Sequence, residues 1–418
     1  MVSAPDNPRT LTTTCCIAGG GPAGMMLGLL LARAGVDVLV LEKHADFLRD
    51  FRGDTIHPST LEIMREVGLD ERLLALPHQK IETLSVSIGK TQAMVGDFRH
   101  LPVTHPFIMQ VPQWDFLDFL LGEARKLPTF RHMMQAQATD LVFDGPKVCG
   151  VRATTPEGVV EIAADLVVDA SGRGSTLREH AGLELIDLGA PIDVFWFHLP
   201  LKPADTEQTG GRFDAGGLFV QIFRGTYWQC AYVIPKGSAD QIRQQGIEAF
   251  RKRISDFDPF EPERAQALAS FDDVKLLSVS VDRLKTWFAP GYLAIGDAAH
   301  AMSPVGGVGI NLAVQDAVAS ANRLAAPLLA GRLSIADLEA VQRRREWPTR
   351  VIQRGQVFVH RNVLTPVLQA KRIDSPPLFV RLVKRFPVLA RIPARILGLG
   401  IRPEHVATPA ARFPHVKA

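Results

Sequence analysis

The sequence contains little cysteine, little tyrosine and no long uninterrupted apolar run. Its 418 residues include 4 cysteines and 3 tyrosines. The cysteines are Cys15, Cys16, Cys149 and Cys230, and no Cys-x-x-Cys pair occurs, so we expect neither a metal site nor a disulfide framework. Glycine, proline or a charged residue interrupts each apolar segment before the roughly 18 residues that a membrane-spanning helix needs.

Excess charge of one sign is also lacking. The net charge is only +3, and no stripe of basic and aromatic residues accompanies it, so we expect no nucleic-acid partner. The N-terminal residues MVSAPDNPRTLTTT do not show the charged-then-apolar pattern of a secretory signal. These absences predict a cytoplasmic protein, and the length suits two intertwined domains rather than one.

The first well-marked unit is a strand, a glycine-rich turn, a helix and a second strand. Residues 12–18 are β-branched and apolar, residues 22–34 are compatible with a helix, and residues 36–41 resemble a short buried strand. A β-α-β unit of this kind is the nucleus of a doubly wound parallel sheet. It predicts an α/β fold.

The turn within this unit carries a dinucleotide-binding pattern. Residues 19–24, Gly-Gly-Gly-Pro-Ala-Gly, fit G-x-G-x-x-G, in which glycine lets a pyrophosphate approach the N–H groups that begin the helix. Glu42 follows the second strand, where a carboxylate accepts hydrogen bonds from ribose hydroxyls. The alternative is a structural turn beside a surface glutamate. The predicted nucleotide contacts are Gly19, Gly21, Ala23, Gly24, Glu42 and Lys43.

Two further glycine-containing segments follow near residue 300. Residues 293–300, LAIGDAAH, form an apolar strand ending in Gly-Asp, and the Asp297 carboxylate suits a ribityl or ribose hydroxyl. Residues 304–311, PVGGVGIN, open a helix whose N–H groups suit the negative charge that develops on a reduced flavin ring. The alternative for this second segment is a glycine turn with a capping asparagine. Its predicted cofactor contacts are Gly309, Ile310 and Asn311.

Together these motifs resemble the aromatic-hydroxylase type of FAD-dependent monooxygenase, the class of para-hydroxybenzoate hydroxylase and the ubiquinone-biosynthesis hydroxylases. The resemblance implies an α/β fold with a Rossmann-like FAD-binding domain (GR2-type), an inserted β-sheet substrate domain and a helical C-terminal region. We expect residues 11–72, 111–189 and 286–345 to form the FAD-binding domain. Residues 73–110 and 190–285 would form the substrate domain, and residues 346–418 the C-terminal region.

The resemblance assigns further cofactor contacts by position. Arg52 matches the family's arginine after the second strand, near the FAD pyrophosphate, and its guanidinium offers a fixed fork of donors. Gln113 opens an apolar helical segment, residues 113–126, and matches a family position held by Arg or Gln for the same purpose. Ala138 is assigned to the cofactor site in the same way. The alternatives are a surface ion pair for Arg52 and a plain helix cap for Gln113.

One segment departs from the hydroxylase pattern. Residues 165–178, DLVVDASGRGSTLR, have Ser171-Gly172 where the family usually has Asp-Gly, a segment that touches FAD and the nicotinamide cofactor. Ser-Gly also resembles flavin-dependent halogenases and geranylgeranyl reductases, but the halogenase segment W-x-W-x-I-P is absent. A hydroxyl can replace part of the hydrogen bonding of a carboxylate.

The resemblance implies the reaction as well as the cofactor. NADPH or NADH would reduce FAD, O2 would form a flavin hydroperoxide, and its distal oxygen would hydroxylate or epoxidise a hydrophobic, aromatic or polyketide-like small molecule. Pro304 and Gly307 would border the reacting edge of the flavin. Candidates that orient or deprotonate the substrate are His198, Arg224, Tyr227 and Tyr232, although a lone His or Tyr on a strand is more often a core or surface residue. A C=C reductase of the geranylgeranyl-reductase type and a non-catalytic flavin-binding module are the alternative functions.

Local signals predict several element boundaries. Ser59 with Glu62 forms a capping-box pattern, and Gly68 suits the position just past that helix. Ser334 with Asp337 indicates another helix start. Short strands broken by DGPK and PEG turns are expected in residues 136–169, and aromatic-rich strands in residues 190–235.

The C-terminal residues 371–402 hold eight Lys or Arg and one Asp among apolar side chains. Such a stretch fits an anionic membrane surface. The plainer interpretation is a helix packed on the body of the protein, because Pro376, Pro377 and Pro387 break any long helix. The sequence leaves a monomer and a homodimer both open.

Overall fold

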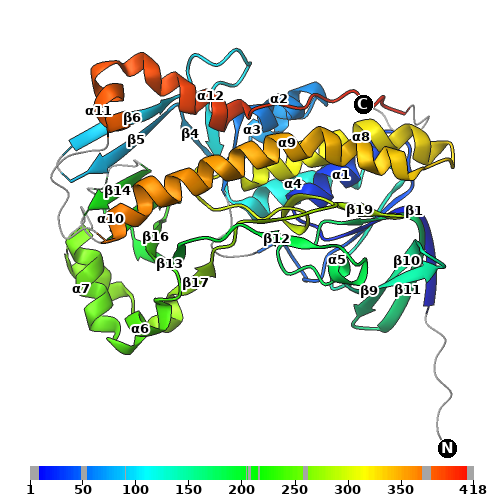
Figure 1. Ribbon diagram of the computed structural model, residues 1–418, viewed down its shortest axis with the longest axis horizontal. Coiled ribbons are helices and arrows are strands. Elements are labelled where there is room, and N and C mark those ends of the chain that lie inside the picture. The colour runs from blue at the N-terminus through cyan, green and yellow to red at the C-terminus, as the bar shows by residue number, and fades with distance from the viewer. Residues whose placement is uncertain are drawn as a thin grey trace, which may run out of the picture.

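Two β-sheets organise the chain, one in each half of the molecule (Figure 1). The computed structural model describes residues 9–48, 54–89, 91–203, 205, 209–214, 217–257, 262–369 and 378–411. Helices cover both sheets, and the longest of them crosses from one half to the other. The expected α/β fold is confirmed.

The first sheet has eight strands and contains the glycine-rich turn. Its strands run in the order β19-β20-β11-β1-β2-β8, and β10 and β9 extend it from β11. The four pairings β20–β11, β11–β1, β1–β2 and β2–β8 are parallel. The bounds are β1 (Arg9–Ala18), β2 (Val38–Leu41), β8 (Phe130–Met133), β9 (Gln137–Asp144), β10 (Lys147–Thr155), β11 (Gly158–Asp169), β19 (Phe288–Ala289) and β20 (Tyr292–Ala294).

Three helices with strongly apolar sequences pack beside this sheet. They are α1 (Pro22–Arg33), α4 (Gln113–Ala124) and α8 (Gly309–Leu329), and α1 contacts both of the others. Every residue from Ala23 to Ala32 is buried, which explains why the predicted helix has no polar face. The N-terminal strand and helix therefore lie at the centre of this half.

Local sequence signals located several element boundaries, with one error. α9 (Ile335–Val359) begins with the capping box of Ser334 and Asp337, and Gly68 has a φ of +74° just after α2 (Pro58–Glu66), both as predicted. Ser59, however, is not the cap of α2. The helix already begins at Pro58, whose fixed φ suits a first helical position, so Ser59 lies inside the first turn.

The second sheet has seven strands and combines two distant parts of the chain. Its order is β17-β13-β16-β15-β14-β5-β6. The bounds are β5 (Thr83–Ile88), β6 (Thr91–Asp97), β13 (Ile192–Pro200), β14 (Gly210–Asp214), β15 (Gly217–Phe223), β16 (Tyr227–Pro235) and β17 (Lys275–Ser278). A three-stranded sheet of β3 (Thr55–Ile56), β7 (Ile108–Gln110) and β4 (Gln79–Ile81), and a pair of β12 (Leu185–Asp187) and β18 (Asp282–Leu284), complete the strands in the described ranges.

The two faces of the seven-stranded sheet have different neighbours, because successive side chains alternate across a strand. One face packs its aromatic residues against α6 (Ala239–Gln244) and α7 (Ile247–Phe257), forming a closed core around Phe250. The opposite face packs with Val305, Val359 and Leu364, which come from the segment before α8 and from the end of α9 and beyond. We call this second surface the inner face. Its sheet residues include Val194, Trp196, Leu218, Ala231 and Val233.

The C-terminal helices lie over the seven-stranded sheet. α9 crosses the molecule and continues into a π-helical turn, η4 (His360–Leu364), and α10 (Thr365–Gln369), which contacts β15 and β16 (Figure 1). α11 (Leu378–Arg385), η5 (Pro387–Ala390) and α12 (Arg391–Leu399) all contact β6. Pro387 follows α11 as expected, whereas Pro376 and Pro377 lie outside the described residues. The short remaining helices are α3 (Asp70–Leu74), α5 (Leu177–His180), η1 (Pro262–Ala267), η2 (Phe271–Asp273) and η3 (Gly296–Ala298).

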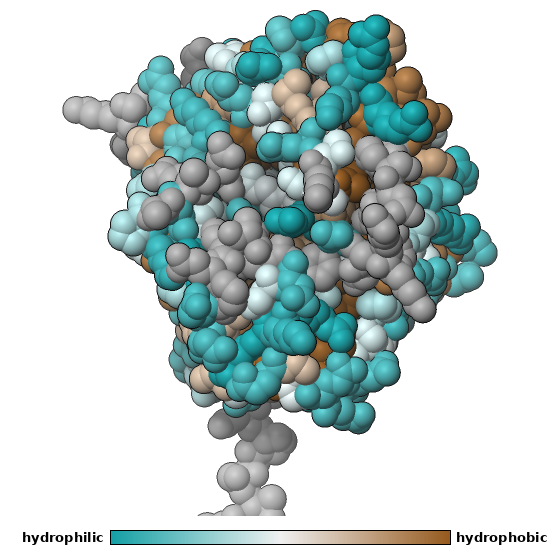
Figure 2. All heavy atoms as spheres, turned by 90° about the vertical axis from the view of Figure 1, so that its left-hand side faces the viewer, coloured by the Kyte–Doolittle hydropathy of each residue, from teal (hydrophilic) through white to brown (hydrophobic). Residues whose placement is uncertain are grey.

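The basic C-terminal segment is amphipathic in place. Val380, Val383 and Ala394 are buried against the sheet, while Phe386 and Ile392 are exposed. Figure 2, which looks onto this end of the molecule, shows hydrophobic residues scattered between hydrophilic ones on the surface that is coloured. No helix in the described part of the chain has the length and apolarity to cross a bilayer.

Candidate functional site

The three glycine-containing motifs meet at one edge of the eight-stranded sheet. β1, β2 and β11 are parallel, as are β11 and β20, so the residues that follow them lie at the same edge. A Cβ on Gly296 would lie 3.1 Å from the Cβ of Ala23 and 3.5 Å from the Cβ of Ala313. Gly296 therefore sits between the first turns of α1 and α8. Ligands of parallel α/β sheets bind at this carboxyl edge.

Each glycine of the first motif is explained by a different feature of the structure. Gly19 has a φ of +111°, and a Cβ there would collide with the backbone of Ala170. A Cβ on Gly24 would collide with the carbonyl oxygen of Gly19, so Gly24 permits the close packing of α1 on β1. A Cβ on Gly21, by contrast, would meet nothing within 4 Å. Gly21 is the N-cap of α1, and no side chain caps this helix.

An open glycine at an uncapped helix N-terminus fits the pyrophosphate of FAD. The N–H groups of the first helical turn have no intrahelical acceptors and, with the helix dipole, attract an anion. The start of α8 repeats this arrangement, because it also lacks a side-chain cap and a Cβ on Gly309 would meet nothing within 4 Å. The N-termini of α1 and α8 therefore suit a cofactor that carries negative charge at two separate places.

The predicted contacts near the end of β2 lie close to the glycine turn. The Glu42 carboxylate accepts hydrogen bonds from the N–H groups of Gly20 at 3.0 Å and His44 at 3.1 Å, which fixes it beside the turn. The Ala136 N–H donates to the Glu42 carbonyl at 2.8 Å, and Ala138 follows two residues later on β9. Lys43 is exposed next to Glu42.

The two positions taken from the family's phosphate contacts have different outcomes. Gln113 is the first residue of α4, a helix that contacts α1. Arg52 lies outside the described residues, so its predicted contact stays a prediction.

Asp297 lies at the expected place and has a partner that the sequence did not reveal. Arg173 Nε donates to Asp297 Oδ2 at 3.0 Å, and a second nitrogen of Arg173 donates to the Met302 carbonyl at 2.9 Å. The third nitrogen, Nη1, is buried without a hydrogen-bond partner among the described residues. Arg173 follows directly after Ser171-Gly172, and this position was its only sequence signal. A buried donor beside Asp297 suits an oxygen atom of the cofactor.

Ser171, the departure from Asp-Gly, is held by a buried carboxylate. Its hydroxyl donates to Asp169 Oδ1 at 2.6 Å and its N–H to the same oxygen at 2.9 Å. The hydroxyls of Ser175 and Tyr292 donate to Asp169 Oδ2. Burial, followed by the negative charge of Asp169, holds the pKa of Tyr292 well above its usual value, so this hydroxyl remains a donor. Ser171 thus belongs to a network that fixes the end of β11.

The segment before α8 forms a tight turn. The Gly307 N–H donates to the Pro304 carbonyl at 3.0 Å, and Gly306 and Gly307 have φ values of +86° and +62°. Residues 304–309 are called the Pro304 turn below. Ile310 and Asn311 lie in the first turn of α8.

Asn311 does not cap α8, which was the alternative to a cofactor contact. Its Oδ1 accepts hydrogen bonds from the hydroxyls of Ser59 at 2.6 Å and Thr60 at 2.9 Å. The side chain therefore joins α8 to α2.

The four substrate-site candidates do not lie together. His198 and Tyr227 alternate with core residues onto the inner face, and their ring centroids are 4.5 Å apart. Tyr232 lies on the opposite face, 1% exposed and edge-on to Phe250. Arg224 is buried and paired with Asp54.

Asp54 and Thr55 connect the inner strands to the Pro304 turn, and sequence reasoning missed both. Asp54 forms an ion pair with Arg224, each side chain being 4% exposed, and also accepts a hydrogen bond from Gln229 at 3.3 Å. Burial lowers the pKa of Arg224 to about 10. The next residue, Thr55, donates its hydroxyl to the Gly307 carbonyl at 3.0 Å. Arg224 and Gly307, both predicted site residues, are thus joined through two consecutive residues.

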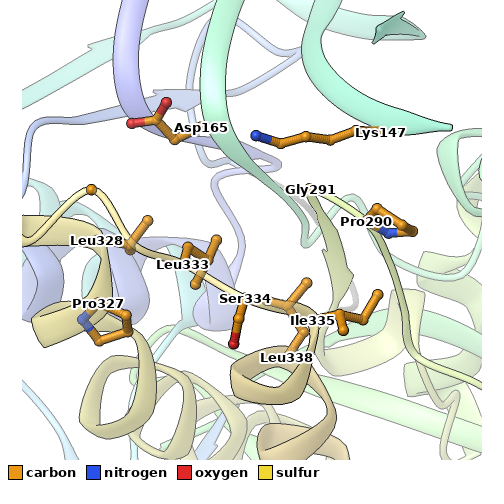
Figure 3. A pocket seen from close by; sticks show the side chains of 11 residues that line it. Lys147, Asp165, Pro290, Gly291, Pro327, Leu328, Leu333, Ser334, Ile335 and Leu338 are labelled. Atoms are coloured by element: carbon orange, nitrogen blue, oxygen red, sulfur yellow. The ribbon is translucent and has the colours of Figure 1, made fainter. Parts of the chain in front are cut away.

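One surface cavity in the described part of the chain lies away from the three motifs. It has a volume of about 240 Å³, and Figure 3 shows Lys147 and Asp165 on one side of it and leucines from the α8–α9 region on the other. Asp165 precedes the buried end of β11, and Gly291 precedes β20. The cavity is therefore at the amino ends of parallel strands, whereas the three motifs lie at their carboxyl ends.

Comparisons with known proteins agree with this geometry. A family profile described as "FAD binding domain" matches residues 12–354. The 6-methylpretetramide 4-monooxygenase of Streptomyces rimosus is 32% identical over 392 residues, 92% of this chain and 92% of that protein. The protoasukamycin 4-monooxygenase of Streptomyces nodosus subsp. asukaensis is 26% identical over 82% of this chain and 87% of that protein.

A solved structure shows the same fold. The p-nitrophenol 4-monooxygenase PnpA from Pseudomonas putida DLL-E4 matches with a TM-score of 0.76 at 20% identity, covering 94% of this chain and 100% of that chain. The predicted cofactor is therefore confirmed as FAD, and the predicted enzyme class as oxidoreductase. The chain belongs to the family of FAD-dependent monooxygenases that carry this FAD-binding domain.

Proposed function

We propose that the protein hydroxylates a fused-ring aromatic polyketide, with NADPH or NADH as reductant and O2 as co-substrate. The observation that carries this proposal is the 32% identity to 6-methylpretetramide 4-monooxygenase along 92% of both chains. The relative named for protoasukamycin supports the same broad substrate class. The C=C reductase and the non-catalytic module are not favoured, because these relatives are named as monooxygenases.

The chain's own residues would hold FAD at three places. The turn at Gly21 would take the pyrophosphate, Glu42 a ribose hydroxyl, and Asp297 with Arg173 the ribityl chain and phosphate oxygens. The N-terminus of α8 would face the flavin ring. FAD, when bound, supplies the oxygen activation, and the protein supplies orientation and exclusion of water.

The substrate would lie beside Val305, where the Pro304 turn meets the inner face. Trp196, Leu218 and neighbouring apolar residues offer the flat, dry surface that a fused ring system needs. His198 and Tyr227 offer polar groups on that face, and the ion pair of Arg224 with Asp54 keeps the strands at a fixed distance from the turn. We also propose that the two sheets mark the FAD-binding and substrate domains at the boundaries expected from the sequence.

Oxygen transfer to a candidate substrate tests this function. Purified FAD-loaded protein is mixed with NADPH, then NADH, in air, and 6-methylpretetramide is added. We expect substrate-stimulated oxidation of the nicotinamide and a product heavier by one oxygen atom. If neither occurs while the S. rimosus enzyme, tested in parallel, forms its product, this substrate assignment is wrong. Reduction of the substrate without oxygen uptake would instead favour the reductase.

A further inference from the structure

The end of α9 holds the residues on both sides of Pro304. Gln356 Nε2 donates to the carbonyls of Ser303 at 2.9 Å and Val305 at 3.0 Å, and Gln356 Oε1 accepts the Ser303 N–H at 3.1 Å. One turn later, His360 Nε2 lies 2.8 Å from Ser303 Oγ. Ser303 and His360 are 1% and 0% exposed. These contacts fix the polypeptide that enters the Pro304 turn.

The hydrogen bonds around Ser303 indicate which nitrogen of His360 carries the proton. Ser303 Oγ accepts the Val305 N–H at 3.3 Å and lies 2.8 Å from His360 Nε2. We take the Ser303 hydroxyl as the donor to Nε2, because its proton has no other hydrogen-bond acceptor among the described residues. A neutral imidazole that accepts at Nε2 has its proton on Nδ1. Burial lowers the pKa of His360, which keeps the ring neutral near pH 7.

Nδ1 of His360 is therefore a buried donor in need of an acceptor. It has no hydrogen-bond partner within the described part of the chain. A buried donor without an acceptor is destabilising, and buried polar groups in folded proteins almost always have a partner. His360 also begins the π-helical turn η4, a distortion that is frequent at functional sites.

The surroundings of His360 place it beside the proposed substrate site. The flanking residues Val359 and Leu364 pack in one cluster with Val305 of the Pro304 turn and with Trp196 of the inner face. His360 thus contacts the residue that precedes the Pro304 turn, and its neighbours on the same helix pack with the turn and the sheet.

We propose that His360 is a substrate-binding residue that donates its Nδ1–H to an oxygen atom of the substrate, with Ser303 holding the ring in orientation. This inference rests on the proposed function and narrows it to substrates that present a phenolic, enolic or carbonyl oxygen next to the Pro304 turn. Gln356 and the π-helical turn position the ring.

Two substitutions of His360 test whether its ring binds substrate or only supports the structure. The side-chain amide nitrogen in His360→Asn lies near the position of Nδ1, and that in His360→Gln near the position of Nε2. The oxidised, FAD-loaded proteins are titrated with 6-methylpretetramide without reductant, and the flavin absorbance reports binding. We expect His360→Gln to weaken binding about tenfold or more and His360→Asn to stay within about threefold of wild type.

If His360→Asn weakened binding more than His360→Gln, the proposal would be overturned, because the bond to Ser303 would then determine affinity. Equal affinity in both variants, whether unchanged or equally reduced, would also overturn it. Asn362→Ala in the same π-helical turn is the control, since Asn362 is exposed and its side chain donates to the Phe358 carbonyl at 2.9 Å. FAD affinity and Tm are measured for each variant to establish that it is folded.

A second measurement tests the role of His360 independently of the proposed substrate. If wild-type protein does not bind 6-methylpretetramide, that substrate is wrong, and 15N NMR of histidine-labelled, FAD-loaded protein still tests His360. We expect a neutral ring with the proton on Nδ1. The ring signals are assigned to His360 because they disappear in His360→Gln, and we expect Ser303→Ala to shift them. A ring protonated on Nε2, or charged at pH 7, would overturn the proposal.

Discussion

At the scale of single residues, Arg173 is the least expected part of the proposed cofactor site. Its guanidinium joins Asp297 to the Met302 carbonyl and leaves Nη1 as a buried donor. We expect Arg173→Ala to weaken FAD binding roughly tenfold to hundredfold, because charge-assisted hydrogen bonds to phosphate are strong. Quenching of flavin fluorescence during titration of the apoprotein measures this. Arg152→Ala removes the same charge from an exposed pair with Glu161, and equal weakening in this control would point to net charge instead.

Two tyrosines on one strand give a test of the inner face. Tyr227 and Tyr232 are five residues apart on β16 and lie on opposite faces. We expect Tyr227→Phe to lower kcat/KM for the substrate about tenfold through loss of a hydroxyl contact, and Tyr232→Phe to change it less than about twofold. Steady-state kinetics with 6-methylpretetramide, the proposed substrate, checks both variants. The reverse result would place the substrate on the face covered by α6 and α7.

At the scale of elements, the turn between β1 and α1 combines packing with cofactor binding. A Cβ on Gly24 would collide with the Gly19 carbonyl, whereas a Cβ on Gly21 would meet nothing within 4 Å. We expect Gly24→Ala to lower the Tm of the apoprotein strongly or prevent folding. Gly21→Ala should cost no more than about 1 kcal/mol of folding free energy but weaken FAD binding at least about tenfold, since its methyl group takes the space of the pyrophosphate. Unchanged FAD affinity in Gly21→Ala would show that the pyrophosphate lies elsewhere.

Elements defined by short-range patterns were predictable, and contacts between distant elements were not. The β1–α1–β2 unit, the capping box at Ser334 and the turn at Gly68 depend on residues within a few positions of one another. The error at Ser59 has the same origin, because Pro58 offered a competing start one residue earlier.

The missed site residues are paired across long stretches of sequence. Arg173 meets Asp297 from 124 residues away, and Thr55 meets Gly307 from 252 residues away. Alternation along a strand shows that Tyr227 and Tyr232 face opposite ways, but only the tertiary structure shows which face meets the Pro304 turn. The π-helical turn at His360 has no sequence signal that we can identify.

At the scale of the whole molecule, the C-terminal segment returns to the FAD-binding half after covering the second sheet. Glu404 pairs with Arg344 and Arg345 of α9, and the Val406 N–H donates to Glu66 at the end of α2 at 2.7 Å. The Ala411 N–H then donates to the Arg33 carbonyl of α1 at 2.8 Å. The helices over the seven-stranded sheet are therefore anchored at both ends to the half that contains the glycine-rich turn.

A buried carboxylate, that of Asp316, links α8 to α9 and to the Gly-Asp segment after β20. Asp316 of α8 is 0% exposed and accepts a hydrogen bond from the Gly296 N–H at 3.1 Å. His300 Nε2 lies 2.6 Å from one of its oxygens, and Arg345 Nε donates to the other at 3.0 Å. Burial alone raises the pKa of Asp316, but His300 and Arg345 outweigh it and hold the pKa below its usual value.

This depressed pKa predicts how stability depends on pH. An unfolded aspartate has a pKa of about 3.9, so the stabilisation by Asp316 is complete above about pH 4 and declines as the pH falls through the lower folded-state pKa. We expect Asp316→Asn to lower the free energy of unfolding by about 3 kcal/mol or more at pH 7, because it removes the buried carboxylate that Arg345 and His300 contact and leaves Arg345 with Glu404 alone as its charged partner. Urea unfolding from pH 7 down to pH 3 should show this difference shrinking below about pH 4. The exposed Asp144→Asn is the control, and a difference that stayed constant with pH would mean that packing, rather than charge, makes Asp316 important.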